Sequence, residues 1–377
     1  KVRIDALAMR LGGANTPIAA SQTKGPFRGV MTVVMRPGGQ TIVVLALASQ
    51  SAYSDAAARR LDDIAGGSAL ARAADQLAPS QCEVYTASKT AKADVLWVVD
   101  DSCSMFSSQT AVAAVGAQIV TRLTNALVDF RAAGVSTGYY APDYAGSVRD
   151  WTDNITTMLS WFRGAMAWGT MGDPSENGFD GLTSFVNNQH PPNAVVMPGP
   201  PRADADLHII FLSDAPEQSN LAPLQVLDLL NLRYPGRRVV LHAIVCPEGT
   251  MCGDGMEGSM GKYHDIVRRT GGVLGSILTF NAMTSTPALS EQQAETMKFV
   301  VQSVISGTGL QLAHRPVVAS TRVATSRTQG SCDNTDVPRD DDHGWQLDSL
   351  TGRLSFAGNC AAPVGTTIAV SYQYWVH

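Results

Sequence analysis

The sequence predicts an α/β protein built on a doubly wound, mostly parallel sheet, with β-rich segments at both ends of the chain. From residue 92 to residue 308, apolar runs of strand length alternate with segments of helical periodicity, as in a sheet covered on both faces. The run 94–99 is almost continuously apolar, as expected of a strand buried on both sides. We therefore expect three regions: an N-terminal segment 1–91, an α/β domain 92–308, and a small β domain 309–377 that packs with the N-terminal segment.

The N-terminal segment combines strand and helix patterns. The apolar runs Val30–Met35 and Thr41–Leu45 are separated by Pro-Gly-Gly turn chemistry, which predicts a β-hairpin. Between Ser54 and Leu77 the apolar spacing fits helical turns, interrupted at Gly66-Gly67 and ended by Pro79.

The α/β region begins with the strand 94–99 and a long amphipathic helix, residues 107–130, whose apolar positions recur every three or four residues. Gly134 is interpreted as the stop that follows this helix. We expect further helices at residues 154–168, 176–187, 222–232, 263–269 and 290–305, and further strands at residues 136–140, 207–212, 238–245 and 273–278. The C-terminal region is expected to contain strands at residues 321–324, 345–347, 353–356 and 367–375.

Composition and hydropathy argue against a nucleic-acid partner and against a transmembrane segment. The 377 residues include 28 Lys and Arg against 33 Asp and Glu, so the net charge of -5 offers no basic field for a phosphate backbone. We therefore expect no nucleic-acid partner. The longest apolar run, Thr41–Ala48, is far shorter than the roughly 20 residues that span a bilayer, so we expect no transmembrane segment.

Cysteine usage favours an oxidising compartment. The six cysteines are Cys82, Cys103, Cys246, Cys252, Cys332 and Cys360, with none of the paired CxxC clusters of zinc sites. Spacing favours one disulfide between Cys246 and Cys252 and another between Cys332 and Cys360, although the sequence also permits other connectivities. The alternative is that some are buried free thiols of a cytosolic protein.

The chain begins with Lys1 rather than Met. We expect that an N-terminal segment was removed or left out, and a signal peptide or a lipid anchor would fit there. With the cysteines, this predicts a protein that is secreted, periplasmic or held at the outer cell surface.

The loop after the first strand of the α/β region has the composition of a divalent-metal site. Asp100, Ser102 and Ser104 alternate in Asp-x-Ser-x-Ser, so in a tight loop their side-chain oxygens converge on one point. Mg²⁺ prefers about six oxygen ligands and commonly leaves a position for a ligand oxygen. Open parallel sheets also bind ligands at the carboxyl ends of their strands.

These residues resemble the metal-ion-dependent adhesion site (MIDAS) of the von Willebrand factor type A (VWA) family, which has a Rossmann-like fold. The resemblance covers about residues 92–308. It implies that the metal, Mg²⁺ or alternatively Mn²⁺ or Ca²⁺, is held by Ser102 and Ser104, with Asp100 and Asp214 holding waters or one coordination position. Asp214 ends an apolar strand in Ser-Asp, as the family's second Asp does.

Two positions depart from the family pattern. The family's Thr maps to Thr170, but the loop is longer than usual, so Asp173 or Ser175 is an alternative third-loop ligand. Cys103 replaces a common Gly, in a form that resembles bacterial secreted and lipoprotein members; a disulfide at Cys103 would pin the metal loop. Some family members shift their last helix on binding, here residues 290–305, and the sequence leaves open whether this one does.

The function predicted from these features is metal-dependent binding or adhesion outside the cytoplasm. The resemblance implies that a carboxylate on a protein or surface ligand completes the metal coordination. The alternative is a structural subunit of a surface assembly or filament, in which the α/β domain is a scaffold. We expect no enzymatic activity, because the sequence contains neither a Gly-x-Ser-x-Gly elbow nor a P-loop.

Overall fold

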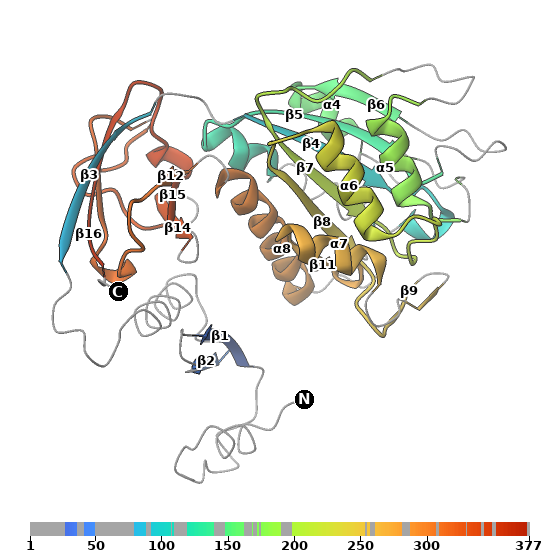
Figure 1. Ribbon diagram of the computed structural model, residues 1–377, viewed down its shortest axis with the longest axis horizontal. Helices are drawn as coiled ribbons and strands as arrows, with labels where there is room; N and C mark the ends of the chain where they lie inside the picture. The colour runs from blue at the N-terminus through green and yellow to red at the C-terminus, as the bar shows by residue number, and fades with distance from the viewer. Residues whose placement is uncertain are drawn as a thin grey trace, which may run out of the picture. The chain divides into compact units, whose positions relative to one another are not determined.

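The computed structural model has a mixed α/β architecture with additional antiparallel sheets (Figure 1). The described residues form two compact units. One contains the strands β1 and β2 with residues 79–81, 315–321 and 372–374, and the other contains the described parts of 82–314 and 322–371. The structure describes residues 27–35, 41–49, 79–87, 92–106, 108, 119–138, 148–161, 168, 172, 175–189, 198–252, 255–256, 261–280, 287–306, 309–328, 330–340, 343–348 and 352–374.

A six-stranded sheet forms the centre of the second unit. Its strand order is β11-β8-β7-β4-β5-β6, and every neighbouring pair is parallel except β5 and β6. The strands are β4 (Lys92–Val99), β5 (Asp129–Ser136), β6 (Val148–Thr152), β7 (Asp206–Leu212), β8 (Val239–Val245) and β11 (Leu274–Ser276). This agrees with the mostly parallel sheet predicted from the sequence.

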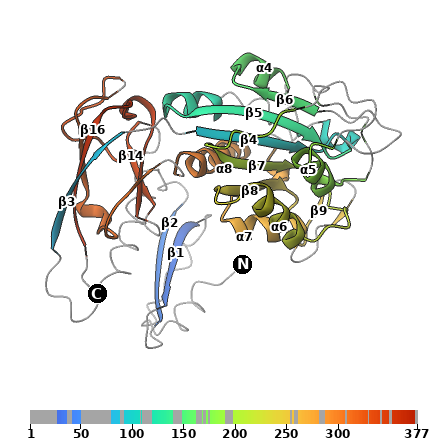
Figure 2. The same cartoon turned by 45° about the horizontal axis from the view of Figure 1, so that its top comes forward.

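Both faces of this sheet are buried, because alternate side chains of each strand enter different hydrophobic cores. In β4, Val95, Trp97 and Val99 belong to one core, while Leu96 and Val98 belong to the other. The first core is completed by α4 (Ile155–Ser160), α8 (Pro287–Ser306) and helical residues 119–125. The second is completed by α5 (Gly178–Val186), α6 (Pro223–Arg233) and α7 (Lys262–Thr270), which Figure 2 shows beside the sheet.

The strand order changes direction next to β4. From β4 the chain passes to β5 on one side, and it later returns to place β7 on the other side. The connections that leave β4 and β7 therefore diverge at the carboxyl edge of the sheet. This divergence is the point at which open α/β sheets bind their ligands.

The C-terminal strands form two small antiparallel sheets, with orders β13-β16-β3 and β12-β15-β14. One of these strands, β3, comes from the segment before the α/β region, so that region lies in sequence between strands of one sheet. The small strands are β3 (Ser80–Thr86), β9 (Met251–Cys252), β10 (Gly255–Met256), β12 (Leu310–Gln311), β13 (Arg322–Thr325), β14 (Trp345–Asp348), β15 (Arg353–Phe356) and β16 (Thr367–Gln373).

The predicted N-terminal hairpin is confirmed. Strands β1 (Phe27–Met35) and β2 (Thr41–Ser49) pair antiparallel in an unbroken register from Phe27 opposite Ser49 to Met35 opposite Thr41. The helix predicted over Ser54–Leu77 lies outside the described residues.

Several predicted element boundaries were wrong. The sequence predicted a helix over 107–130 and a strand over 136–140, whereas helical residues end at 125 and β5 already begins at Asp129. Leu127 adopts a φ of 55°, a left-handed conformation that ends the helix where no glycine marks its end. The antiparallel edge strand β6 was not predicted, and α4 ends at Ser160 rather than at residue 168.

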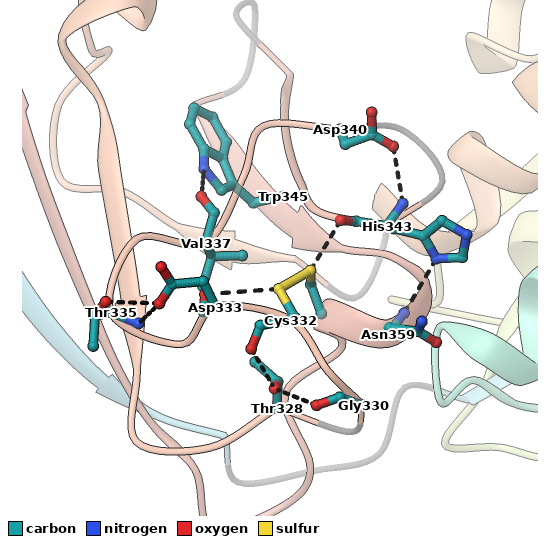
Figure 3. Close-up of a disulfide and its surroundings, with 11 residues drawn as sticks. Thr328, Gly330, Cys332, Asp333, Thr335, Val337, Asp340, His343, Trp345 and Asn359 are labelled. Atoms are coloured by element: carbon teal, nitrogen blue, oxygen red, sulfur yellow. Dashed lines mark hydrogen bonds between the residues drawn. A yellow bond between two sulfur atoms is a disulfide. The ribbon is translucent and has the colours of Figure 1, made fainter.

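Two disulfides join Cys246 to Cys252 and Cys332 to Cys360, the two pairings that the spacing favoured. The second links the loop before β14 to the turn after β15. Figure 3 shows it beside Trp345, whose indole Nε1 donates to the Val337 carbonyl oxygen at 2.9 Å. The disulfide thus closes a segment that also contains a buried aromatic anchor.

No helix among the described residues is long and apolar enough to cross a membrane.

We expect removal of the Cys332–Cys360 disulfide to destabilise the small β sheets. The bond spans 28 residues of sequence, for which loop closure contributes about 3–4 kcal/mol to the free energy of unfolding. Urea unfolding of the double variant Cys332→Ala/Cys360→Ala should show a loss of that size. The control variant Cys82→Ser/Cys103→Ser removes the two free, exposed thiols and should unfold like wild type. An unfolding midpoint for the first variant equal to that of wild type would contradict this account.

A pair of stacked histidines lies buried between β7 and β8. His208 Nδ1 and His242 Nε2 are 3.1 Å apart, and the Val273 amide donates to His242 Nδ1 at 3.1 Å. Burial lowers the pKa of His242 to about 3, and burial together with the neighbouring His242 lowers the pKa of His208 well below its ordinary value. Both side chains are therefore neutral in the folded protein at neutral pH.

We expect His242 to make folding weaker in acid. Between pH 6.5 and about 3 the unfolded chain binds a proton that folded His242 excludes, so its contribution to stability is complete above pH 6.5 and is lost as the pH falls. The stability deficit of His242→Gln relative to wild type should shrink by up to about 1.4 kcal/mol for each pH unit below 6.5. Denaturant titrations between pH 7.5 and 5 measure this difference. A deficit for His242→Gln that stays constant between pH 7.5 and 5 would refute the prediction.

Candidate metal centre

Asp100 connects the loops that follow β4 and β7. Its amide donates to the Leu212 carbonyl oxygen at 2.9 Å, which continues the pairing of the two strands past the end of β4. Its carboxylate is fully buried. Oδ1 accepts the Ser102 amide at 2.9 Å and the Ser102 hydroxyl at 2.6 Å, while Oδ2 accepts the Ser213 hydroxyl at 2.7 Å. Each of the two carboxylate oxygens of Asp100 thus binds one of the two loops.

The side-chain oxygens predicted from the sequence form a continuous run across the divergence between β4 and β7. Ser102 Oγ lies 2.6 Å from Asp100 Oδ1 and 3.0 Å from Ser104 Oγ. Ser104 Oγ donates in turn to Asp214 Oδ1 at 2.8 Å. Four of the five predicted metal ligands are therefore neighbours in the structure, although Asp214 is 110 residues away from Ser104 in sequence.

This run of oxygens fits a small divalent cation. Adjacent ligand oxygens of an octahedron with metal–oxygen distances of about 2.1 Å lie about 3 Å apart, close to the separations between these oxygens. Among the described residues, no group of three His, Cys, Asp or Glu side chains is arranged to hold a metal. A metal at this centre would consequently depend on the serine hydroxyls, which provide ligand oxygens without adding charge.

Two further acidic side chains, Asp101 and Glu176, lie close to Asp100, and neither was predicted from the sequence. Burial raises the pKa of Asp101 to about 6, and burial together with the Asp100 charge raises the pKa of Glu176 to about 10. Thr137 donates its hydroxyl to Glu176 Oε2, while Glu176 Oε1 and Asp101 Oδ1 are buried without a hydrogen-bond partner. A pKa of about 10 keeps Glu176 protonated at neutral pH, and a nearby cation would favour the ionised forms of Glu176 and Asp101.

The third-loop ligand predicted from the sequence lies ahead of α5. Thr170 and its alternative Asp173 fall outside the described residues, so this ligand remains a prediction. Ser175 is half-buried, and its carbonyl oxygen accepts from Asn177. Gly172 donates its amide to the Asp101 carbonyl oxygen at 2.9 Å, and a Cβ there would lie 2.3 Å from Asp101 Oδ1. Only glycine fits this close approach to Asp101, in the loop that follows β4.

Hydrogen bonds to Glu217 fix the loop that bears Asp214. Glu217 Oε2 accepts the Phe179 amide at the start of α5 at 3.0 Å, and Oε1 accepts the Ser219 amide at 2.8 Å. The Gln218 amide donates to the Glu176 carbonyl oxygen at 2.9 Å. These contacts fix the loop after β7 against α5 and against the segment that carries Glu176.

The sequence left open whether Cys103 and Cys82 form disulfides. Both are free, exposed thiols among the described residues. The metal loop is fixed by other means, because the short 3₁₀ turn Cys103–Met105 places the Met105 side chain wholly in the first hydrophobic core. Cys103 points outward since its neighbours Met105 and Ser102 face the interior.

Comparison with known proteins adds little to this geometry. Neither a scan against protein-family models nor a search of curated proteins finds a match. Among solved structures, the chain is similar to proximal thread matrix protein 1 from the mussel byssus, with 15% identity, 60% of this chain and 48% of that chain covered, and a TM-score of 0.35. It is also similar to the pilus adhesin SpaC from Lactobacillus rhamnosus GG in its open conformation, with 12% identity, 81% and 41% covered, and a TM-score of 0.38. The chain thus spans less than half of either protein, and similarity this low supports no conclusion about function.

We expect Ser213→Ala to weaken both the fold and the candidate centre. The substitution leaves Asp100 Oδ2 buried without the Ser213 hydroxyl, which should cost about 1–3 kcal/mol. Thr335→Ala is a matched control, since it removes a hydroxyl-to-carboxylate bond of the same 2.7 Å length to Asp333 at an exposed site. The control should leave the thermal midpoint almost unchanged. Equal shifts for the two variants would show that the buried bond has no special role.

Proposed function

We propose that this chain is a divalent-metal-dependent binding protein of the VWA type, acting outside the cytoplasm. In this proposal Ser102 and Ser104 bind Mg²⁺, or Mn²⁺ or Ca²⁺, with Asp100 and Asp214 beside them. The metal supplies a Lewis-acidic coordination position that accepts a carboxylate from a protein or surface ligand. The role is binding rather than catalysis.

The observation that carries the proposal is the unbroken run of oxygens from Asp100 Oδ1 through Ser102 and Ser104 to Asp214 Oδ1. It lies where the connections of β4 and β7 diverge, which is the position expected of a ligand site in an open sheet. Its Asp-x-Ser-x-Ser motif is also the one by which the sequence resembles the VWA family.

Access to the centre comes from the Ser104 side. Asp100 and Ser102 are buried, whereas Ser104 is half-buried. Next to it along the chain, Cys103 is exposed and the Phe106 side chain is 51% exposed. An exposed aromatic residue beside a polar centre is typical of a surface that binds proteins. We infer that the ligand approaches over Ser104 and contacts Phe106.

The disulfides support a location outside the cytoplasm. Both Cys246–Cys252 and Cys332–Cys360 are formed, and such bonds persist in oxidising compartments. We accordingly propose a secreted, periplasmic or surface-held protein.

A structural subunit of a surface assembly is the second candidate. It is favoured by one specific observation, the open and uncharged edge of the hairpin strand β2. The two roles are compatible, because the hairpin and the candidate metal centre belong to different units of the chain.

The direct test of the first proposal is calorimetric titration with Mg²⁺ and Mn²⁺. Wild type should bind one ion, and both Asp100→Asn and Ser104→Ala should weaken binding about 10–100-fold or more, the range found when groups around a metal are removed. Asp228→Asn is the matched control, since it removes one exposed carboxylate on α6 and should bind like wild type.

Absence of ion binding by wild type would eliminate the metal-dependent function. Binding that survives in both Asp100→Asn and Ser104→Ala would place the ion elsewhere. Circular dichroism of each variant separates loss of the site from loss of the fold.

A further inference from the structure

Strands β1 and β2 pair with each other over nine residues each, and none of the other strands that the structure describes pairs with either outer edge. Figures 1 and 2 show the two strands side by side. Each outer edge presents a row of backbone donors and acceptors. An isolated two-stranded hairpin is at best marginally stable in water, and a third or fourth strand is the usual remedy.

Strands β1 and β2 differ in the residues that protect their outer edges against pairing with a further strand. Strand β1, FRGVMTVVM, contains Arg28 and Gly29. Strand β2, TIVVLALAS, has no charged residue, proline or glycine, and its register with β1 contains no bulge. Val43 on β2 is 38% exposed. A long, uncharged, apolar edge of this kind is a template for pairing with another strand.

Every other edge strand that the structure describes carries a device against such pairing. Two kinds occur: a charged side chain or register shift in the longer strands, and very short length in the rest. Edge strand β6 has Arg149, Asp150 and a register shift against β5, β3 has Glu83, β13 has Arg322, β14 has Asp348, β11 has three residues, and β9, β10 and β12 have two each. Among the strands that the structure describes, β2 is thus the exception in lacking such a device.

We propose that the open edge of β2 pairs with β2 of a second copy of this chain, in antiparallel register centred on Leu45. The result is a continuous four-stranded sheet in the order β1-β2-β2-β1. The inference concerns the hairpin alone and does not depend on the metal centre.

The sequence of β2 is complementary to itself in this register. Thr41 stands opposite Ser49 of the second copy at both ends of the pairing, so polar residues meet polar residues. Between them a large residue pairs with a small one in two of the four remaining kinds of pair, Ile42 with Ala48 and Val44 with Ala46. Val43 pairs with Leu47, and Leu45 pairs with itself. No like charges meet, because β2 carries none. A charged strand of a different protein would find no complementary charge on this edge, which favours a second copy as the occupant.

The first experiment measures the mass of the 377-residue chain in solution by light scattering and sedimentation. Wild type should have twice the 39.9 kDa mass of one chain. Leu45→Lys places two like charges opposite each other at the centre of the pairing and should weaken the dimer by more than about tenfold. Met31→Lys is the matched control, since Met31 is the partner of Leu45 across the hairpin and introduces the same charge on β1. It should leave the dimer almost intact.

The second experiment traps the register in a background with Cys82→Ser and Cys103→Ser, which removes the free thiols. Residues directly opposite each other in antiparallel strands have Cα atoms about 4.5–5.5 Å apart, within the range of a disulfide. Leu45→Cys should therefore cross-link two chains under mild oxidation. Met31→Cys should not, because the two β1 strands would lie about 14 Å apart across the four-stranded sheet.

A monomeric wild type overturns the proposal. It is also overturned by a dimer that the two lysine variants weaken equally, or by cross-linking that is as efficient from Met31→Cys as from Leu45→Cys. Both lysine variants place one charge at the same cross-strand pair of the hairpin, so an equal effect of the two indicates a general loss of hairpin structure and counts against pairing through β2.

Discussion

The carboxylate of Asp100 is the group on which the candidate centre depends. One of its oxygens binds the loop after β4 through Ser102, and the other binds the loop after β7 through Ser213. These loops lie more than one hundred residues apart in the chain and meet because β4 and β7 are neighbours in the sheet. A fully buried carboxylate is unfavourable unless hydrogen bonds or a cation compensate its charge. The fold supplies the hydrogen bonds, and the arrangement of oxygens beyond them suits the cation.

Two further acidic side chains, Asp101 and Glu176, lie close to the buried Asp100 carboxylate. Glu176 and Asp101 both have pKa values raised by burial, and the charge of Asp100 raises them further. Glycine at position 172 allows the neighbouring loop to approach Asp101 closely, and Glu217 fixes the loop that carries Asp214. The raised pKa keeps Glu176 protonated at neutral pH, and one carboxyl oxygen each of Glu176 and Asp101 has no hydrogen-bond partner, so a nearby cation would favour the ionised forms of both groups.

The local pattern of apolar residues was sufficient to predict the two strands that end in Asp100 and Asp214. The strands 94–99 and 207–212 were recognisable because each is a continuous apolar run that ends in Asp or Ser-Asp, and these endings contain Asp100 and Asp214. The end of the helix before β5 could not be recognised, because it depends on the left-handed conformation of Leu127 rather than on a glycine. Interactions between distant elements were not visible in the sequence either. Glu176 is a single acidic residue ahead of a helix, and only its contact with Thr137 at the end of β5 places it in the centre. Such clusters arise from strand order, which a pattern of hydrophobicity does not contain.

Binding of a divalent cation by the hydroxyl groups of Ser102 and Ser104 is tested most directly by the anomalous diffraction of crystals grown with Mn²⁺. We expect one anomalous peak at bonding distance from both serine hydroxyls and adjacent to Asp100 and Asp214. The absence of a peak there at saturating Mn²⁺, or a single peak elsewhere in the molecule, would contradict this expectation.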